Sequence, residues 1–257
     1  MVLNLPVQQR LIVAADFKPV TGADPVLNPK KWRSWVRDKV LRLSDQLART
    51  GVIIKVNSAL RSVGYDLIDE IHARGLRVFA DLKLIDIDGT LSTDGTLLTE
   101  AKPELVTAMC LAGPKALLAL KAALPKTEIL GVTVLTSLTE ADALSMFHCS
   151  INEAAVMLAK IARDVGLGGL ISSVKEAPAL RAVITEDMTV NTPNIRPNWI
   201  VVKDDDQNKG RSATPAEAFQ AGVSRIVMGR PIVEATNPYD AVMRTLKEIE
   251  KALVAAT

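Results

Sequence analysis

Two carboxylates and one ammonium lie within six positions of one another in "FADLKLIDIDGT", residues 79–90. These groups are Asp81, Lys83 and Asp86, and they follow apolar residues that are typical of a buried strand. Side chains two positions apart in a strand project from the same face, so we expect Asp81 and Lys83 to point the same way. Removing an ion from water costs several kcal/mol unless the ion finds a partner. The spacing therefore indicates either a structural ion pair at a strand end or a group that does chemistry.

Other apolar segments also end in polar residues, which are Asp16, Lys55, Thr136-Ser137, Ser172-Ser173 and Gly229-Arg230. If the strands form a barrel, catalytic groups belong at their carboxyl ends, so this repeated pattern favours an active site there. The stretch "MGRPI" (228–232) combines a glycine that permits close backbone approach with an arginine whose fork suits phosphate. For this stretch taken alone, a surface ion pair of Arg230 is an equally good interpretation.

Strand-like and helix-like segments alternate along the whole chain. We expect eight strands, at residues 10–16, 51–56, 77–83, 103–110, 128–135, 168–173, 188–193 and 224–230. Helical periodicity predicts helices at 29–50, 58–75, 93–102, 114–124, 139–166 (one or two helices), 177–184, 214–222 and 238–254. Strands that are apolar on both faces and separated by helices argue for a parallel sheet. Eight such units in 257 residues favour an α/β fold of the (β/α)₈ TIM-barrel type, in one domain over residues 1–257.

Composition excludes several classes of function. The chain is 48% hydrophobic with a net charge of +2, and aromatic residues make up only 4%, which argues against a nucleic-acid-binding surface. We expect no membrane span and no signal peptide, and the two cysteines fit a reducing cytoplasm. With only two histidines and no metal-ligand spacing, a transition-metal site or a Ser-His-Asp triad is not expected. No G-x-G-x-x-G follows the first strand, which weakens a dinucleotide-binding interpretation.

The chain resembles the orotidine 5′-monophosphate decarboxylase family. "DLKLIDI" (81–87) is similar to the D-x-K-x-x-D-I signature of that family. The likeness continues in order through "LIVAAD" and "IKV" at the first two strands, "GVTVLTS" (131–137), "TPNIRP" (192–197) and "GRPI" (229–232). It spans roughly residues 10–235. The resemblance implies a cofactor-free and metal-free decarboxylation of orotidine 5′-monophosphate to uridine 5′-monophosphate, in pyrimidine biosynthesis in the cytoplasm.

The same resemblance implies a role for individual residues. Asp81 would lie against the substrate carboxylate, Lys83 would protonate C6 as carbon dioxide leaves, and Lys55 would hold Asp81 and the ribose. Asp16 would bind a ribose hydroxyl, and Ser137 would bind the pyrimidine edge.

Further substrate contacts implied by the family pattern come from Pro193, Gln207, Gly229 and Arg230, the last three at the phosphate. In the family, the residues matching Asp86 and Thr90 reach into the site of a neighbouring subunit, so the resemblance also implies a homodimer. The segment 194–213 is expected to be a lid over the phosphate. Where the family usually has glycine, this chain has Asn194, which tolerates a positive φ better than most residues.

Two alternatives stay open from the residues alone. A Mg²⁺-dependent decarboxylase or aldolase acting on a ketose phosphate would keep Asp81 and Lys83. A catalytically silent nucleotide-phosphate-binding protein would not need a carboxylate facing an anionic ligand.

Overall fold

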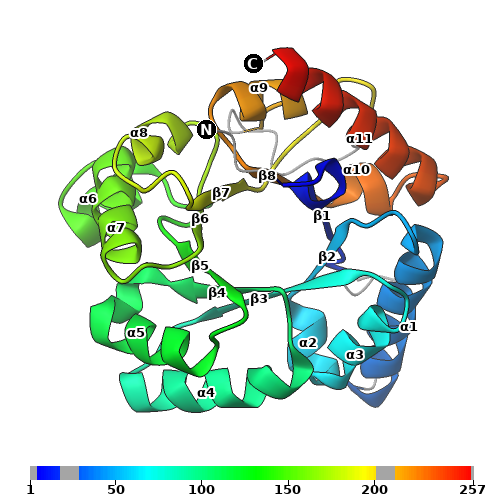
Figure 1. The fold of residues 1–257 in the computed structure, drawn as a ribbon, viewed down its shortest axis with the longest axis horizontal. Helices are drawn as coiled ribbons and strands as arrows, with labels where there is room; N and C mark the ends of the chain where they lie inside the picture. The colour runs from blue at the N-terminus through cyan, green and yellow to red at the C-terminus, as the bar shows by residue number, and fades with distance from the viewer. Residues whose placement is uncertain (1–4, 18–28, 201–211, 256–257) are drawn as a thin grey trace.

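Eight parallel strands close into a barrel at the centre of the molecule (Figure 1). The computed structural model describes residues 5–17, 29–200 and 212–255. The strands pair in sequence order, and β1 also pairs with β8. Their bounds are β1 Leu11–Ala14, β2 Ile53–Val56, β3 Arg77–Leu84, β4 Leu105–Met109, β5 Glu128–Val132, β6 Gly169–Ile171, β7 Thr189–Thr192 and β8 Arg225–Met228. The predicted (β/α)₈ barrel is therefore confirmed.

Helices surround the barrel (Figure 1). They are α1 Pro29–Leu47, α2 Ser58–Val63, α3 Asp66–His72, α4 Asp88–Ala101, α5 Gly113–Ala123, α6 Glu140–Phe147, α7 Ile151–Asp164, α8 Ala177–Arg181, α9 Pro215–Gln220, α10 Arg230–Val233 and α11 Pro238–Ala255. Short 3₁₀ turns lie at Val7–Arg10 (η1) and Cys110–Ala112 (η2). Among the described residues, no helix is long and apolar enough to cross a membrane.

Two helix predictions differ from the structure. The expected single helix over 58–75 is two helices, because Gly64 ends α2 with a φ of 107°, a backbone conformation that glycine adopts without strain. The helix expected at 93–102 begins earlier, at Asp88. Its first turn therefore follows directly on the segment that carries Asp86.

Strand periodicity fixes which side chains fill the barrel. Ile12, Ile53, Phe79, Leu105, Leu130 and Val227 form a buried cluster with Ala14 inside the ring of strands. The residues between them along each strand belong to a second, larger core that lies between the barrel and the helices. Since side chains alternate along a strand, each residue two positions beyond an inward-facing one also faces inward.

Charged and polar side chains occupy the amino-terminal end of the barrel. Arg225 places Nη1 and Nη2 at 2.9 and 2.8 Å from the two carboxylate oxygens of Glu128 and donates a further bond of 3.1 Å to Asn191. Thr189 also donates to Glu128, at 2.7 Å. Arg225 is buried, and a buried charge is tolerated when it is paired in this way.

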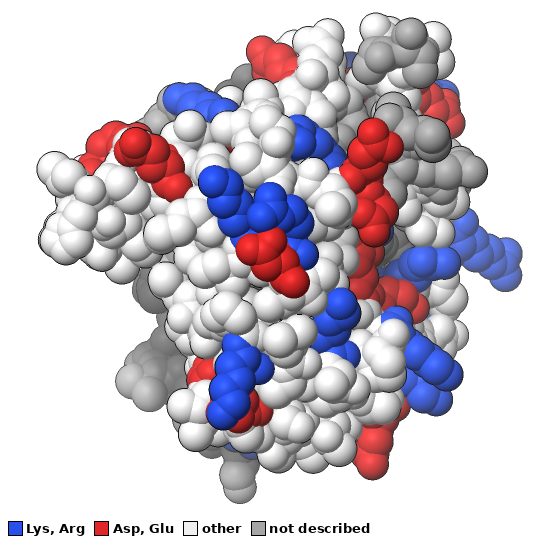
Figure 2. Space-filling view, turned by 60° about the vertical axis from the view of Figure 1, so that its left-hand side comes forward, with Lys and Arg blue, Asp and Glu red and all other residues white. Residues whose placement is uncertain are grey.

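The outer surface carries charges of both signs. On the face shown in Figure 2, basic and acidic side chains are interspersed rather than gathered into separate regions.

Candidate active site

A cavity of about 690 Å³ opens at the carboxyl ends of the strands. Its volume falls in the usual range for small-molecule sites. The residues that line it are Ala14, Asp16, Phe17, Lys55, Phe79, Asp81, Lys83, Val132, Val134, Leu135, Thr136, Ile171, Pro193, Asn194, Arg196, Val227, Gly229, Arg230, Val233 and Glu234. They come from both halves of the chain, so closure of the barrel assembles the cavity.

The charged residues of the cavity continue the inward faces of the first three strands. Lys55 lies two positions after Ile53, and Asp81 lies two positions after Phe79. Asp16 follows the inward-facing Ala14 in the same way, just beyond the end of β1. Apolar side chains therefore fill the middle of the barrel, and ionic ones occupy its carboxyl end.

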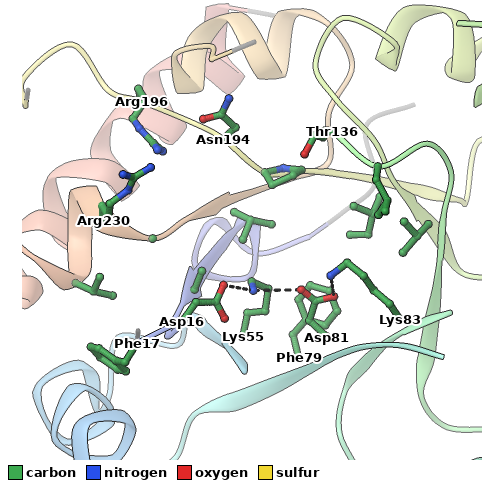
Figure 3. A pocket seen from close by; sticks show the side chains of 18 of the residues that line it. Asp16, Phe17, Lys55, Phe79, Asp81, Lys83, Thr136, Asn194, Arg196 and Arg230 are labelled. Atoms are coloured by element: carbon green, nitrogen blue, oxygen red, sulfur yellow. Dashed lines mark hydrogen bonds and ion pairs between the residues drawn. The ribbon is translucent and has the colours of Figure 1, made fainter. Parts of the chain in front are cut away.

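These side chains form a continuous chain of ion pairs (Figure 3). Lys55 Nζ lies 2.5 Å from Asp16 Oδ2 and 3.2 Å from Asp81 Oδ2. Lys83 Nζ lies 2.6 Å from the other oxygen of Asp81, Oδ1. The side chains of Lys55 and Asp81 are each 9% exposed, whereas that of Lys83 is 32% exposed. Of the two lysines in this series of ion pairs, Lys83 is thus the one that is more open to the cavity.

The ion pairs keep the buried groups charged. Burial by itself raises the pKa of Asp81, but Lys55 and Lys83, with hydrogen bonds from Lys83 and Thr107, outweigh burial and hold that pKa below its usual value. Burial by itself lowers the pKa of Lys55, but the carboxylates of Asp16 and Asp81 outweigh it and leave that pKa raised. At neutral pH the cavity therefore presents a carboxylate between two ammonium groups.

Two arginines lie across the cavity from these ion pairs. Figure 3 shows the side chains of Arg196 and Arg230 close to one another, with Asn194 beside them. Asn194 has a φ of 68°, which agrees with the prediction that asparagine can take the place of glycine in this turn. The backbone N–H of Arg196 donates to the carbonyl of Ala213 at 2.9 Å, which fixes the chain where it leaves the cavity.

Most of the residues singled out from the sequence line this cavity, and three lie elsewhere. Asp16, Lys55, Asp81, Lys83, Pro193, Gly229 and Arg230 are among the lining residues. Asp86, Thr90 and Ser137 are exposed and are not among the lining residues of this chain. Gln207 lies outside the described residues, as does the part of the predicted lid from 201 to 211.

Asp86 faces its own helix α4 rather than the cavity. Its Oδ1 accepts a hydrogen bond of 2.7 Å from the backbone N–H of Ile87. Burial raises the pKa of Asp94 on α4, and the carboxylate of Asp86 raises it further. The first aspartate of the D-x-K-x-x-D motif, Asp81, thus lines the cavity, whereas the second, Asp86, lies outside it.

The structure adds residues that sequence reasoning had not selected. Arg196, which lies within the motif "TPNIRP", lines the cavity. Thr136, one of the polar residues predicted at the strand ends, also lines it, whereas its neighbour Ser137, the expected pyrimidine contact, does not. Thr107 hydrogen-bonds to Asp81 and carries no motif signal. Among the described residues, no group of three or more His, Cys, Asp or Glu side chains is placed to hold a metal ion.

Comparisons with known proteins agree on one family. Residues 9–245 match the model of the "Orotidine 5'-phosphate decarboxylase / HUMPS family". A protein of Hahella chejuensis named orotidine 5'-phosphate decarboxylase is 32% identical over 94% of this chain and 97% of its own length. One of the same name from Prochlorococcus marinus is 38% identical over 73% of this chain and 80% of its own length.

Solved structures agree with this assignment. The crystal structure of orotidine 5'-phosphate decarboxylase from Lactobacillus acidophilus is 27% identical, with a TM-score of 0.72 over 94% of this chain and 99% of that one. Together with the closed barrel and the Asp81–Lys83 pair, these matches show that the chain belongs to the orotidine 5'-phosphate decarboxylase / HUMPS family.

Proposed function

We propose that this protein decarboxylates orotidine 5′-monophosphate to uridine 5′-monophosphate, without a metal or an organic cofactor. One observation carries the proposal: a single cavity holds a buried carboxylate between two lysines on one side and two arginines on the other. The two sides suit a substrate with a reacting carboxylate at one end and a phosphate at the other. The names of the curated relatives support the same reaction.

The chemistry follows from the position of Asp81. A substrate carboxylate about 3 Å from Asp81 would be repelled by about 5 kcal/mol at an effective dielectric constant of about 20. That repulsion disappears as the carboxylate becomes neutral carbon dioxide, while the ammonium of Lys83 attracts the carbanion that develops at C6. Interactions that improve toward the transition state accelerate the reaction. Lys83 then delivers its proton to C6.

Binding at the phosphate offsets the repulsion at the carboxylate. Arg196 and Arg230 supply two guanidinium groups, each able to donate a pair of hydrogen bonds to phosphate oxygens. Outside its chain neighbours, the nearest atoms that a Cβ added at Gly229 would meet belong to Ala14, at 3.6 Å or more, so there is open space beside this backbone for a phosphate oxygen. The backbone of Gly229, with a φ of −107° and a ψ of −101°, lies outside the regions that other residues favour, which itself calls for glycine. Gln207 and the segment 194–213 remain our candidates for the rest of the phosphate grip and its lid.

Contacts to the sugar and the base come from other lining residues. Asp16 hydrogen-bonds a ribose hydroxyl, and Lys55 holds both Asp16 and Asp81 in place. Apolar residues, among them Phe79 and Ile171, also line the cavity and suit the flat face of a pyrimidine. At the pyrimidine edge our candidates are Ser137, from the family pattern, and Thr136, which lines the cavity.

We also propose that the active unit is a homodimer with shared sites. Asp86 and Thr90 are exposed and do not line the cavity of their own chain. The side chains on either side of Asp86, Ile85 and Ile87, are 53% and 70% exposed, and Leu97 on α4 is 56% exposed. Exposed apolar side chains of this kind often mark an interface. A second copy of the chain would cover them and would receive Asp86 and Thr90 in its own cavity.

The deciding experiment follows the ultraviolet absorbance of orotidine 5′-monophosphate after it is mixed with purified, chelator-treated protein. We expect the absorbance change of decarboxylation at full rate, and no increase in rate when Mg²⁺ is added back. No turnover of orotidine 5′-monophosphate would refute the proposal. Activity that appears only with Mg²⁺, on a ketose phosphate, would support the metal-dependent alternative instead.

A further inference from the structure

The pairing of β3 with β4 is interrupted beside the ion-pair chain. Ala80 of β3 pairs with Val106, but the next paired residue of β3 is Leu84, with Ala108, so the register shifts between them. Lys83 lies in this irregular stretch with a φ of 50°, in the left-handed region that residues other than glycine rarely adopt. Such a conformation is unfavourable for a residue with a Cβ and persists only when surrounding contacts hold it.

A threonine side chain takes the place of the missing strand pairing. The backbone N–H of Lys83 donates a hydrogen bond of 2.9 Å to Thr107 Oγ1, where a regular parallel ladder would offer a backbone carbonyl. The hydroxyl of Thr107 in turn donates to Asp81 Oδ1, also at 2.9 Å. That same oxygen receives the ammonium of Lys83 at 2.6 Å. One hydroxyl thus links the backbone of the lysine to the carboxylate that its side chain contacts.

Because Thr107 is buried, its hydroxyl bonds Lys83 and Asp81 and does not reach a bound ligand. Thr107 is fully buried on β4, two positions after the inward-facing Leu105. Thr107 does not belong to the described residues that line the cavity. It therefore acts on Asp81 and Lys83 and not on a ligand. The groups that face Asp81 are then Lys55, Lys83 and Thr107, with Asp16 on the far side of Lys55.

We infer that Thr107 is a positioning residue, whose hydroxyl holds the strained backbone of Lys83 and the Oδ1 atom of Asp81 in reacting geometry. The inference rests on the proposed decarboxylase function. Without the hydroxyl, the N–H of Lys83 would lose its partner inside the protein, and the turn could relax to a conformation that moves the ammonium away from C6. A small displacement of a reacting group from its productive position lowers the rate strongly.

The test compares Thr107→Val, which keeps the shape and removes the hydroxyl, with Thr107→Ser, which keeps the hydroxyl. The hydroxyl of Thr107 donates to a charged carboxylate, and the free energy of such a hydrogen bond corresponds to a loss of kcat of about ten- to hundredfold in Thr107→Val. KM and the Kd for uridine 5′-monophosphate should stay within about threefold, because no ligand contact is lost. Thr107→Ser should keep kcat within about threefold of the unmodified protein. Thr245→Val is the matched control, since Thr245 is equally buried but bonds only within α11.

Several results would overturn the inference. A Thr107→Val protein with kcat near that of the unmodified chain would do so, as would an equal loss in Thr107→Ser or a loss confined to KM. If Thr107→Val does not fold, Thr107→Cys replaces it, because a thiol is close in size to serine but a weak hydrogen-bond donor. Thr107→Cys should then be slower than Thr107→Ser by about tenfold, and equal rates would contradict us.

A structural readout separates this inference from the proposed function. If the unmodified protein does not turn over orotidine 5′-monophosphate, the proposed function fails, and crystal structures of the ligand-free variants decide the role of Thr107. We expect Thr107→Val to lose the contact between Lys83 Nζ and Asp81 Oδ1 and Thr107→Ser to keep it. The same contact in both variants would show that Thr107 does not position Lys83.

Discussion

Replacement of Lys83 by alanine tests the centre of the proposed mechanism. The change removes the ammonium that lies 2.6 Å from Asp81 Oδ1 and opens toward the cavity. Asp81 keeps two partners, Lys55 at 3.2 Å and Thr107 at 2.9 Å, so no buried carboxylate is left alone. We therefore expect a loss of stability near the ~1 kcal/mol of a partly exposed ion pair rather than the ~3–5 kcal/mol of a broken buried one.

The expected loss of activity is much larger. A general acid contributes about 10²–10⁴ in rate, and the same ammonium also stabilises the carbanion. We predict that Lys83→Ala lowers kcat by at least about a thousandfold, which corresponds to about 4 kcal/mol of activation free energy. Since the phosphate side of the cavity is untouched, binding of uridine 5′-monophosphate should persist.

The assay measures the ultraviolet absorbance change with orotidine 5′-monophosphate, alongside thermal unfolding of the same samples. Lys102→Ala is the matched control: Lys102 is also a lysine in the left-handed region, with a φ of 52°, but lies exposed at the end of α4. A similar loss in both variants would show that the substitution acts through the backbone. A Lys83→Ala protein that is folded and keeps kcat within about tenfold of the unmodified chain would refute Lys83 as the proton donor, because the smallest general-acid contribution is about 10².

Three further predictions follow from the same geometry. Arg230→Ala and Arg196→Ala should each lower kcat/KM for orotidine 5′-monophosphate by about ten- to hundredfold and leave the nucleoside orotidine unaffected, whereas equal losses for both substrates would make these arginines structural. Lys83→Ala and Asp86→Ala chains, nearly inactive alone, should recover activity at about a quarter of their sites when mixed, dissociated and reassembled, since about half the dimers are mixed and each carries one intact site. Activity equal to the sum of the separate variants would show that Asp86 does not cross an interface. Because the pKa of Asp81 is lowered in the folded protein, its charge stabilises the fold above the unfolded pKa of about 3.9, and this contribution is lost as pH falls through the lower folded pKa. The urea-unfolding free energies of the unmodified chain and Asp81→Asn should therefore differ by a constant amount from pH 6 to 8 and converge below about pH 4; a difference that stays the same at pH 3 and pH 7 would contradict this.

The sequence was sufficient for the fold and for one side of the site, because both follow from local periodicity. Strand residues alternate between two faces, so the run from Phe79 to Lys83 shows that an apolar inward face becomes ionic at the strand end. The alternation of strands and helices predicts the parallel barrel, and the barrel predicts that the polar strand ends gather at one face. That Lys55 contacts Asp81 was implied by the family resemblance. These inferences need no knowledge of distances.

Contacts between strands depended on the tertiary structure. The register shift between β3 and β4 decides that Thr107 reaches both Lys83 and Asp81, and nothing in the spacing of residues 81–107 encodes that shift. Closure of the barrel likewise brings Arg196, which follows β7, beside Arg230, which follows β8.

The motif D-x-K-x-x-D shows the same division within six residues. Its first half lies in β3, where strand alternation directs Asp81 into the cavity. Lys83 also lines the cavity, although its own backbone departs from strand geometry with a φ of 50°. Its second half lies beyond the strand, where α4 begins at Asp88 and the carboxylate of Asp86 turns toward that helix. Spacing in sequence determines direction only while the chain stays in one regular element; past the end of β3, packing of the next helix decides where a side chain points.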